Sequence, residues 1–384
     1  MFPPKPPKGA DPRMYFFLFL LTLGTTLGYQ GWTLLYTNFA VESAHLSAAD
    51  NGLVQSLREV PGLLGFLIIP LLLVMKEHRV AAVAALATGL GTALTGFFPS
   101  FVPVILTTLL MSFGFHFFEA VNQSLLLQYF DVRTTPVVMG KLRGLAAVFV
   151  FFCSDFLPYT MMFLIVGALC MFTGVWGLFL DPTNKELPIQ SKKMVFRRKY
   201  WLFYLLTLFL GARRQIFIVF ALFLLVEHFR FSVNTVSVLF MINYAINWFL
   251  NPLIGRTINR IGERKLLSIE YSTAILVFAG YATTGSAWVA GVLYVIDYIV
   301  FNFSIALRTF FQKIAEPQDI APTMAVAQTI NHIAAIFVPA LGGWLWVEFG
   351  YQIPFFIGAA LSGCSLLLVQ IIDREIRLHA PAKA

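Results

Sequence analysis

Long apolar stretches, separated by short polar breaks, run along almost the whole chain. Each stretch extends for about twenty residues, which is the length that a helix needs to cross a bilayer. None shows the alternation of polar and apolar residues that is typical of barrel strands. The pattern predicts about 12 transmembrane helices, over residues 14–38, 51–75, 79–98, 101–129, 137–157, 159–180, 200–226, 232–255, 265–284, 287–312, 320–346 and 351–372.

The composition agrees with this pattern. Hydrophobic residues make up 58% of the 384 residues, and charged residues 12%, against roughly 25% in soluble domains. A chain of mean hydropathy +0.78 exposes its elements to lipid, where only helices or a closed barrel satisfy the backbone. The predicted fold class is therefore an all-α integral membrane protein.

The basic residues indicate which side of the membrane each loop faces. The net charge of +8 does not indicate nucleic-acid binding, because the basic residues lie in short clusters between apolar stretches. If the N-terminus is cytoplasmic, 20 of the 27 Lys and Arg residues fall in cytoplasmic segments, whereas the outer loops hold only Arg230. The positive-inside rule then predicts a multi-pass cell-membrane protein with both termini in the cytoplasm. The short loops favour a bacterial inner membrane.

Motifs for other classes of chemistry are absent from the sequence. Cys153, Cys170 and Cys364 lie within apolar segments and lack the spacing of metal ligands or of a disulfide framework. The sequence contains no H-E-x-x-H, no G-x-S-x-G and no pair of intramembrane aspartates with a glycine motif. We therefore expect no enzyme, no cofactor and no metal site.

The two parts of the chain repeat each other weakly, at an offset of about 186 residues. Phe115–Phe117 pairs with Phe301–Phe303, and Glu77–Arg79 with Glu263–Lys265, in the same order along the chain. Two parallel repeats predict a pseudo-two-fold axis along the membrane normal, with a solute site between the repeats. The predicted domains are a six-helix bundle over residues 1–180, a cytoplasmic linker over 181–199 and a second six-helix bundle over 200–384.

Glycine and basic residues recur in the loop after the eighth predicted helix, at Gly255, Arg256, Arg260, Gly262, Arg264 and Lys265. This loop resembles a signature of the major facilitator superfamily, G-x-x-x-D-R-x-G-R-R. Asn259 stands where that signature has aspartate, and the copy in the first half is shortened to Met75–Arg79. The basic R-x-x-x-G run and the G-P-x-x-G-G motif of drug–proton antiporters are missing. The resemblance covers nearly the whole chain, and it implies secondary transport by alternating access.

Charged residues in the middle of the seventh predicted helix need a physical reason, because each costs about 2.5–3.5 kcal/mol on insertion scales. Arg213 and Arg214 lie there, followed by Gln215. The resemblance implies that this helix lines the central cavity, and guanidinium groups bind carboxylate or phosphate in a bidentate fork. We therefore predict that these three residues contact the solute. The alternative is a structural ion pair with Glu59, Glu119 or Asp297.

Further candidates for solute binding are polar residues on the other predicted cavity helices. Tyr29 and Gln30 are the counterparts of the arginine pair in the first repeat, and His116 shares a face of the fourth helix with Glu119. An interhelical hydrogen bond is the alternative role for the polar residues of the eleventh helix. The predicted set comprises Tyr29, Gln30, His116, Arg213, Arg214, Gln215, Asn302, Asn331 and His332.

Two carboxylates are candidates for proton coupling. Glu119 and Asp297 lie at mid-depth of the fourth and tenth predicted helices. A carboxyl at such depth favours its protonated form unless an arginine compensates it, so a permanent salt bridge is the alternative role. Sodium in place of protons stays open. The remaining charged residues near the helix ends are predicted to form gates, namely Arg58, Glu59, Arg143, Arg308, Arg256 and Arg260.

The balance of intramembrane charges favours an anionic solute. The six bases are Arg58, Lys141, Arg143, Arg213, Arg214 and Arg308, against the acids Glu59, Glu119 and Asp297. A positive excess at this depth is costly unless a bound anion completes it. The leading prediction is a monomeric, proton-coupled carrier of a small organic anion. The alternatives are an exporter of amphipathic or cationic compounds, in which Glu119 binds the cation, and a non-transporting sensor.

Overall fold

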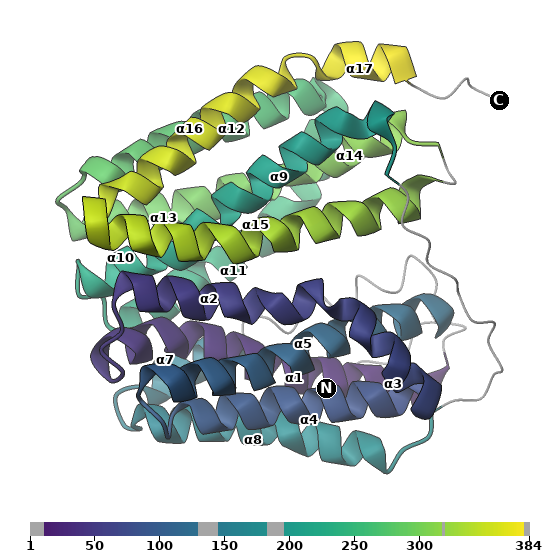
Figure 1. Cartoon of the computed structure of the whole chain (residues 1–384), viewed down its shortest axis with the longest axis vertical. Coiled ribbons are helices and arrows are strands. Elements are labelled where there is room, and N and C mark those ends of the chain that lie inside the picture. The colour runs from purple at the N-terminus through teal and green to yellow at the C-terminus, as the bar shows by residue number, and fades with distance from the viewer. Residues whose placement is uncertain (1–10, 130–144, 183–195, 317–318, 380–384) are drawn as a thin grey trace. The chain divides into compact units, whose positions relative to one another are not determined.

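The computed structural model describes the chain except for residues 1–10, 130–144, 183–195, 317–318 and 380–384. The described part is helical and contains no strand. Figure 1 follows the helices from purple at the N-terminus to yellow at the C-terminus. Up to the central linker, they are α1 (Pro12–Glu42), α2 (Ala48–Leu63), η1 (Gly65–Leu67), α3 (Ile68–Val74), α4 (Glu77–Thr95), α5 (Phe101–Tyr129), α7 (Leu145–Cys153) and α8 (Tyr159–Leu178).

The helices that follow the linker continue to near the C-terminus. Several are interrupted by short segments of different helical type, marked η. They are η2 (Arg198–Tyr200), α9 (Trp201–Gln215), η3 (Ile216–Ala221), α10 (Leu222–Glu227), α11 (Val233–Ile261), α12 (Glu263–Thr283), α13 (Ala287–Phe301), η4 (Asn302–Ser304), α14 (Ile305–Ile314), α15 (Ile320–Phe349), α16 (Gln352–Val369) and α17 (Ile372–His379).

Seven helices in the described ranges are long and apolar enough to cross a membrane, or eight if α2 and the η1–α3 segment form one bent span. The helical fold class is therefore confirmed, whereas the number of twelve spans stays a prediction. The segments predicted over 14–38, 79–98 and 232–255 are helical, as α1, α4 and part of α11, but are not among these seven. The segment predicted over 137–157 lies partly outside the described residues.

Local sequence signals account for several helix ends. Asp11 caps α1, because its carboxylate accepts hydrogen bonds from the backbone N–H groups of Arg13 at 2.8 Å and Met14 at 3.3 Å. Pro12 occupies the first turn of α1, where no backbone N–H partner is needed. Gly262, at φ +82°, makes the tight connection between α11 and α12, a conformation that favours glycine.

The chain packs into two compact units. Each unit is made mainly from one part of the sequence and includes a short segment from the other part. Unit 1 comprises Met1–Leu46, Leu57–Ile189 and Phe231–Met241, and unit 2 comprises Ser47–Ser56, Gln190–Arg230 and Ile242–Ala384. The predicted bundles at 1–180 and 200–384, with the linker 181–199, stay predictions.

Small residues bring the helices of unit 1 close together. In α4, Gly89 lies so near α8 that an added Cβ would stand 2.6 Å from the carbonyl oxygen of Gly167. On the other side of α4, a Cβ on Gly114 of α5 would stand 2.5 Å from the carbonyl oxygen of Ala84. Membrane helices associate through such close packing, because lipid offers no hydrophobic driving force between them.

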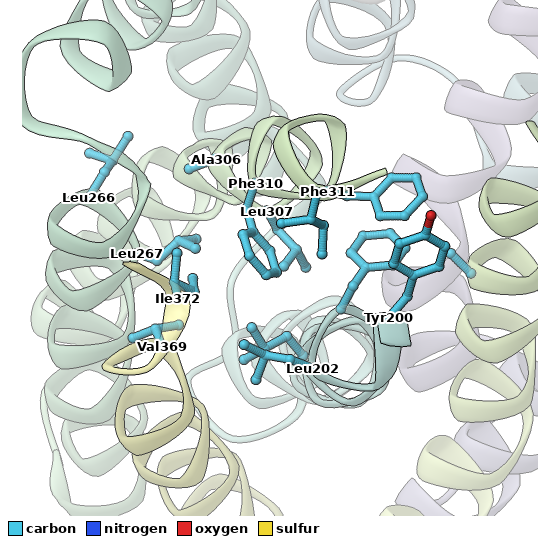
Figure 2. Close-up of a cluster of buried hydrophobic side chains, with 14 of the residues drawn as sticks. Tyr200, Leu202, Leu266, Leu267, Ala306, Leu307, Phe310, Phe311, Val369 and Ile372 are labelled. Atoms are coloured by element: carbon cyan, nitrogen blue, oxygen red, sulfur yellow. The ribbon is translucent and has the colours of Figure 1, made fainter. Parts of the chain in front are cut away.

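Aromatic and aliphatic side chains fill one end of unit 2. Figure 2 shows the cluster, to which Tyr200 and Leu202 contribute from η2 and α9, and Val369 and Ile372 from α16 and α17. In Figure 1, α12 and α16 lie side by side, and these two helices also contact each other closely. The cluster fixes the start of α9, the helix that carries the arginine pair.

Two helices of unit 2 lose their regular hydrogen bonding near the middle. After Gln215, α9 passes into six residues of π-helix, η3, before continuing as α10. After Phe301, α13 passes into three residues of 3₁₀-helix, η4, before continuing as α14. Such interruptions are frequent at functional positions of helices. Here they directly follow the residues that form the site described next.

Candidate functional site

Arg213 is the centre of a buried ionic cluster in unit 2. Its side chain is 2% exposed, and its Nη2 atom donates to Oε1 of Glu270 at 2.5 Å. Its Nη1 atom lies 3.8 Å from Oδ1 of Asp297. The rings of Tyr271 and Phe301 each lie 5.6 Å from the guanidinium carbon, within the range of cation–π interactions. The structure therefore places Arg213 among acids and aromatic rings contributed by α12 and α13.

The sequence prediction did not include Glu270, so the predicted number of intramembrane acids was too small by one. Glu270 is in α12 and is completely buried. Its position seven residues after Glu263, inside a predicted membrane helix, was the available signal. With Glu270 included, the positive excess is smaller by one charge, and Arg213 has two acid partners in its own unit.

The cluster contains more polar atoms than the described residues satisfy. Oε2 of Glu270 and both carboxylate oxygens of Asp297 lack a hydrogen-bond donor in the described part of the chain. The hydroxyls of Tyr271 and Tyr281 and the Nε atom of Arg213 are likewise buried without a hydrogen bond to any described residue. Buried polar groups are normally hydrogen-bonded, so the described residues leave these atoms without their usual partners.

Arg214 differs sharply from its neighbour. Its side chain is exposed on unit 2, although it lies within the apolar span Arg198–Glu227. Its one recorded contact among the described residues is with the ring of Phe301, 5.6 Å from its guanidinium carbon. Adjacent residues on a helix point about 100° apart. One arginine of the pair is therefore engaged inside the unit, while the other is accessible.

The remaining predicted solute residues of unit 2 have different surroundings. The side-chain amide of Asn302 is hydrogen-bonded within unit 2. Its Nδ2 atom donates to Oδ1 of Asn247 at 2.6 Å and to the carbonyl oxygen of Tyr298 at 2.8 Å. Asn331 is half-buried on α15 and packs directly against Gly211 of α9. Gln215 is buried, with Oε1 unbonded among described residues, and His332 is half-buried.

A second polar cluster, in unit 1, joins α1, α2 and α5. Nη2 of Arg58 pairs with Oε1 of Glu59 at 2.5 Å, and Nη1 donates to the hydroxyl of Tyr29 at 2.7 Å. The ring of Tyr29 stacks on Phe115, with 3.7 Å between centroids, and the hydroxyl of Ser112 donates to the backbone carbonyl of Arg58. The structure thus brings together one predicted solute residue and two predicted gate residues.

The other predicted residues of unit 1 lie on or near this cluster's helices. Glu119 is exposed, although it lies within the apolar span Phe101–Gln123, and His116 is half-buried on the same helix. Gln30 is half-buried on α1. An exposed carboxylate at this depth is unusual, because lipid does not solvate it. Glu119 therefore stays a predicted site for a proton or a cation.

Ion pairs tie the start of α9 to the start of α15 in unit 2. Both Nε and Nη2 of Arg197 lie 3.3 Å from Oδ1 of Asp319, and the hydroxyl of Tyr200 donates to Oδ2 of Asp319 at 3.0 Å. Lys199 pairs with Glu316 across the same junction. Burial works to raise the pKa of Asp319, but the Tyr200 hydroxyl and the charges of Arg197 and Lys199 outweigh it and hold that pKa below its ordinary value.

Three of the predicted gate residues are exposed, unlike the buried pair of Arg58 and Glu59. Arg256 and Arg260 are exposed on the last turns of α11, and Arg308 is exposed on α14. Arg143 lies outside the described residues. Nothing in the structure assigns these residues a gating role, which stays a prediction. No group of three or more His, Cys, Asp or Glu residues in the described ranges could hold a metal ion.

A helical membrane fold with buried charges at mid-span is typical of a polytopic transporter. The model of the Major Facilitator Superfamily matches residues 18–333. The chain therefore belongs to this superfamily. It is a membrane protein of secondary transport, and the resemblance in the loop after the eighth predicted helix pointed to the correct family.

Solved structures of transporters have the same fold. The nucleoside transporter NupG is 17% identical, with a TM-score of 0.75, over 94% of this chain and 99% of that one. A bacterial homologue of the human lysosomal transporter Spinster, in an inward-facing and unoccupied conformation, is 16% identical with a TM-score of 0.76, over 98% of this chain and 100% of that one. A search of the curated proteins finds no match. These likenesses establish the fold and leave the solute open.

Proposed function

We propose that this chain is a proton-coupled secondary transporter of a small organic anion, working by alternating access. The observation that carries the proposal is the exposure of Arg214 within the apolar span Arg198–Glu227. A cation there is too costly to face lipid, so it faces a water-filled path. Its planar fork of donors fits a carboxylate or phosphate group.

The cluster around Arg213 supports proton coupling. One guanidinium between the carboxyls of Glu270 and Asp297 leaves one net negative charge if both are ionised. All three side chains are at most 2% exposed, and an uncompensated buried charge is costly. A single proton shared by the two carboxyls balances the charge. Loss of that proton would change the field around the neighbouring Arg214. Glu119 is the second candidate for the coupling proton.

The orientation and the organisation of the carrier are part of the same proposal. Both termini face the cytoplasm, in the inner membrane of a bacterium, and the carrier works as a monomer. The distribution of Lys and Arg residues along the sequence supports this orientation. Arg58 with Glu59, Arg308, and Arg256 with Arg260 are the proposed gates.

The first experiment measures the thermal stability of the purified protein against lactate, succinate, benzoate, uridine and tetraphenylphosphonium. A ligand that binds only the folded protein stabilises it by about 2.7 kcal/mol at a hundred times its dissociation constant. We expect a carboxylate to raise the melting temperature of the wild type and of Arg308→Ala, but not of Arg214→Ala. Stabilisation by uridine or the lipophilic cation alone would refute the anion proposal.

The second experiment measures coupling in proteoliposomes that contain a pH-sensitive dye. Uptake of the stabilising carboxylate should acidify or alkalise the lumen in proportion to flux. Glu270→Gln keeps the size of the side chain and leaves Arg213 balanced by Asp297 alone, so the proton movement should be lost while exchange of labelled solute continues. Proton movement equal to that of the wild type would contradict the role of this cluster and favour Glu119. A requirement for sodium at constant pH would replace the proton.

The exporter of cationic or amphipathic compounds remains the second candidate. The observation that favours it is the exposed carboxylate of Glu119 on α5. In that case tetraphenylphosphonium stabilises the wild type, and Glu119→Gln abolishes the effect while Arg214→Ala does not.

A further inference from the structure

The ring of Phe301 contacts both members of the arginine pair. Its centroid lies 5.6 Å from the guanidinium carbon of Arg213 and 5.6 Å from that of Arg214. We propose that Phe301 is a positioning residue for Arg214, whose guanidinium it holds where the anionic group of the solute meets it. The proposal rests on the proposed function for the identity of the solute's charged group, although the contact itself does not depend on it.

The two arginines depend on this ring to very different degrees. Arg213 is held by Glu270, Asp297 and the ring of Tyr271, so Phe301 is one contact among several. Arg214 is exposed, and the ring is its one recorded contact among the described residues. Fixing an arginine side chain in one conformation costs rotamer entropy. The ring limits this freedom before the solute arrives, which lowers the cost of binding.

The backbone around Phe301 is itself fixed. Phe301 is the last residue of α13, and η4 begins at Asn302. The Asn302 amide closes this turn by donating to the carbonyl oxygen of Tyr298, and it joins α11 by donating to Asn247. Asp297 lies four residues before Phe301, on the same face of α13. One short segment therefore supplies both the carboxylate for Arg213 and the ring for Arg214.

The segment from Asp297 to Phe301 connects proton coupling, proposed for the cluster around Arg213, with anion binding, proposed for Arg214. Any change at Asp297 that shifts α13 also shifts the ring against Arg214. Cation–π contacts contribute about 0.5–1 kcal/mol at exposed sites and about 2 kcal/mol when desolvated. Loss of the ring should therefore weaken binding of an anion by about 2- to 30-fold.

The first test is independent of the solute and follows the modification of arginine by phenylglyoxal, read by mass spectrometry. The reagent attacks the neutral guanidine, and a ring that stabilises the cation slows the reaction. In Phe301→Leu, Arg214 should react several-fold faster than in the wild type, whereas Phe301→Tyr should restore the slow rate. The matched control is Phe303→Leu, which removes a half-buried ring from η4, two residues further along the chain. This variant should leave the rate of Arg214 modification unchanged. An unchanged rate in Phe301→Leu overturns the proposal.

The second test replaces Phe301 by mono-, di- and trifluorophenylalanine in the full-length protein. Successive fluorines weaken the negative potential of the ring face and hardly change its shape. The affinity for the carboxylate that stabilises the wild type should fall step by step with each fluorine. A flat series, with binding still abolished by Arg214→Ala, refutes the role of the ring but keeps the anion carrier. If no carboxylate binds, the proposed function fails, and the phenylglyoxal rates still decide the role of Phe301.

Discussion

At the scale of single residues, the surroundings of a side chain decide what its charge does. Arg213 and Arg214 are chemically identical neighbours, yet one is 2% exposed between two acids and the other is accessible. Removal of the first leaves two buried carboxylates without their cation, whereas removal of the second leaves only the ring of Phe301, which carries no charge. The two arginines should therefore respond very differently to the same substitution.

Arg213→Ala should destabilise the protein strongly, because breaking a buried ion pair by removing one partner costs about 3–5 kcal/mol. Arg214→Ala should leave the melting temperature close to that of the wild type. Thermal unfolding in detergent, followed by intrinsic fluorescence, compares the two variants directly. Adding Glu270→Gln to Arg213→Ala removes one stranded charge and should recover part of the loss. Equal melting temperatures for both single variants would contradict the buried cluster.

Asp319 should make stability depend on pH at the acidic end. Because the pKa of its carboxyl is lowered in the folded protein, its contribution is complete above the ordinary value of about 4 and disappears as the pH falls through the lowered value. Asp319→Asn should lower the melting temperature at pH 7, and the difference from the wild type should shrink as the pH falls below the ordinary pKa of an aspartate, about 4. Asp373→Asn, which affects a half-exposed pair with Arg264, is the control and should have a smaller effect. A difference that is constant with pH would refute the contribution of the ionised carboxylate.

At the scale of elements, the arrangement of the helices depends more on close packing and on interruptions within helices than on helix propensity. The contacts of α4 with α5 and α8 depend on glycines that admit a neighbouring backbone. In unit 2, η3 and η4 interrupt two helices directly after Gln215 and Phe301. An apolar sequence determines that a helix forms in lipid, but the positions of closest approach determine how two helices meet.

Gly114→Ala tests this packing. The added Cβ would overlap backbone atoms of Thr88 and Ala84 in α4, which cannot yield as a flexible side chain would. We expect a loss of about 1–3 kcal/mol, the usual cost of overpacking, and a lower melting temperature. Gly65→Ala is the matched control, since nothing lies within 4 Å of a Cβ at Gly65. If both variants melt alike, α4 and α5 are not packed as described.

At the scale of the whole molecule, the chain is a transporter of the major facilitator superfamily. Its basic residues predict its orientation in the membrane. The asymmetry of 20 Lys and Arg residues against one predicts that both termini lie in the cytoplasm. The amphipathic helix α17 carries Arg374 and Arg377 on its exposed side, as expected of a segment beside a cytoplasmic surface.

Labelling with a membrane-impermeant maleimide in intact cells tests the orientation. The three native cysteines are first replaced by serine or alanine. A cysteine at Gly285, exposed between α12 and α13, should be labelled from outside, whereas a cysteine at Arg377 should be labelled only after the cells are opened. The reverse pattern would show that the topology is inverted, so that each loop lies on the opposite side of the membrane from the one proposed.

The sequence by itself determined the class of the protein, because length and hydrophobicity of a segment suffice to predict helices in lipid. It also located Arg213, Arg214 and Asp297, since any charge in an apolar span is conspicuous. Only the tertiary structure showed that Arg213 pairs with Glu270, 57 residues away, and that Arg214 is left accessible. It also brought Tyr29 to Arg58, and Phe301 to both arginines. The reason is that burial and pairing depend on which helix faces meet, and this is decided by packing between segments distant in sequence.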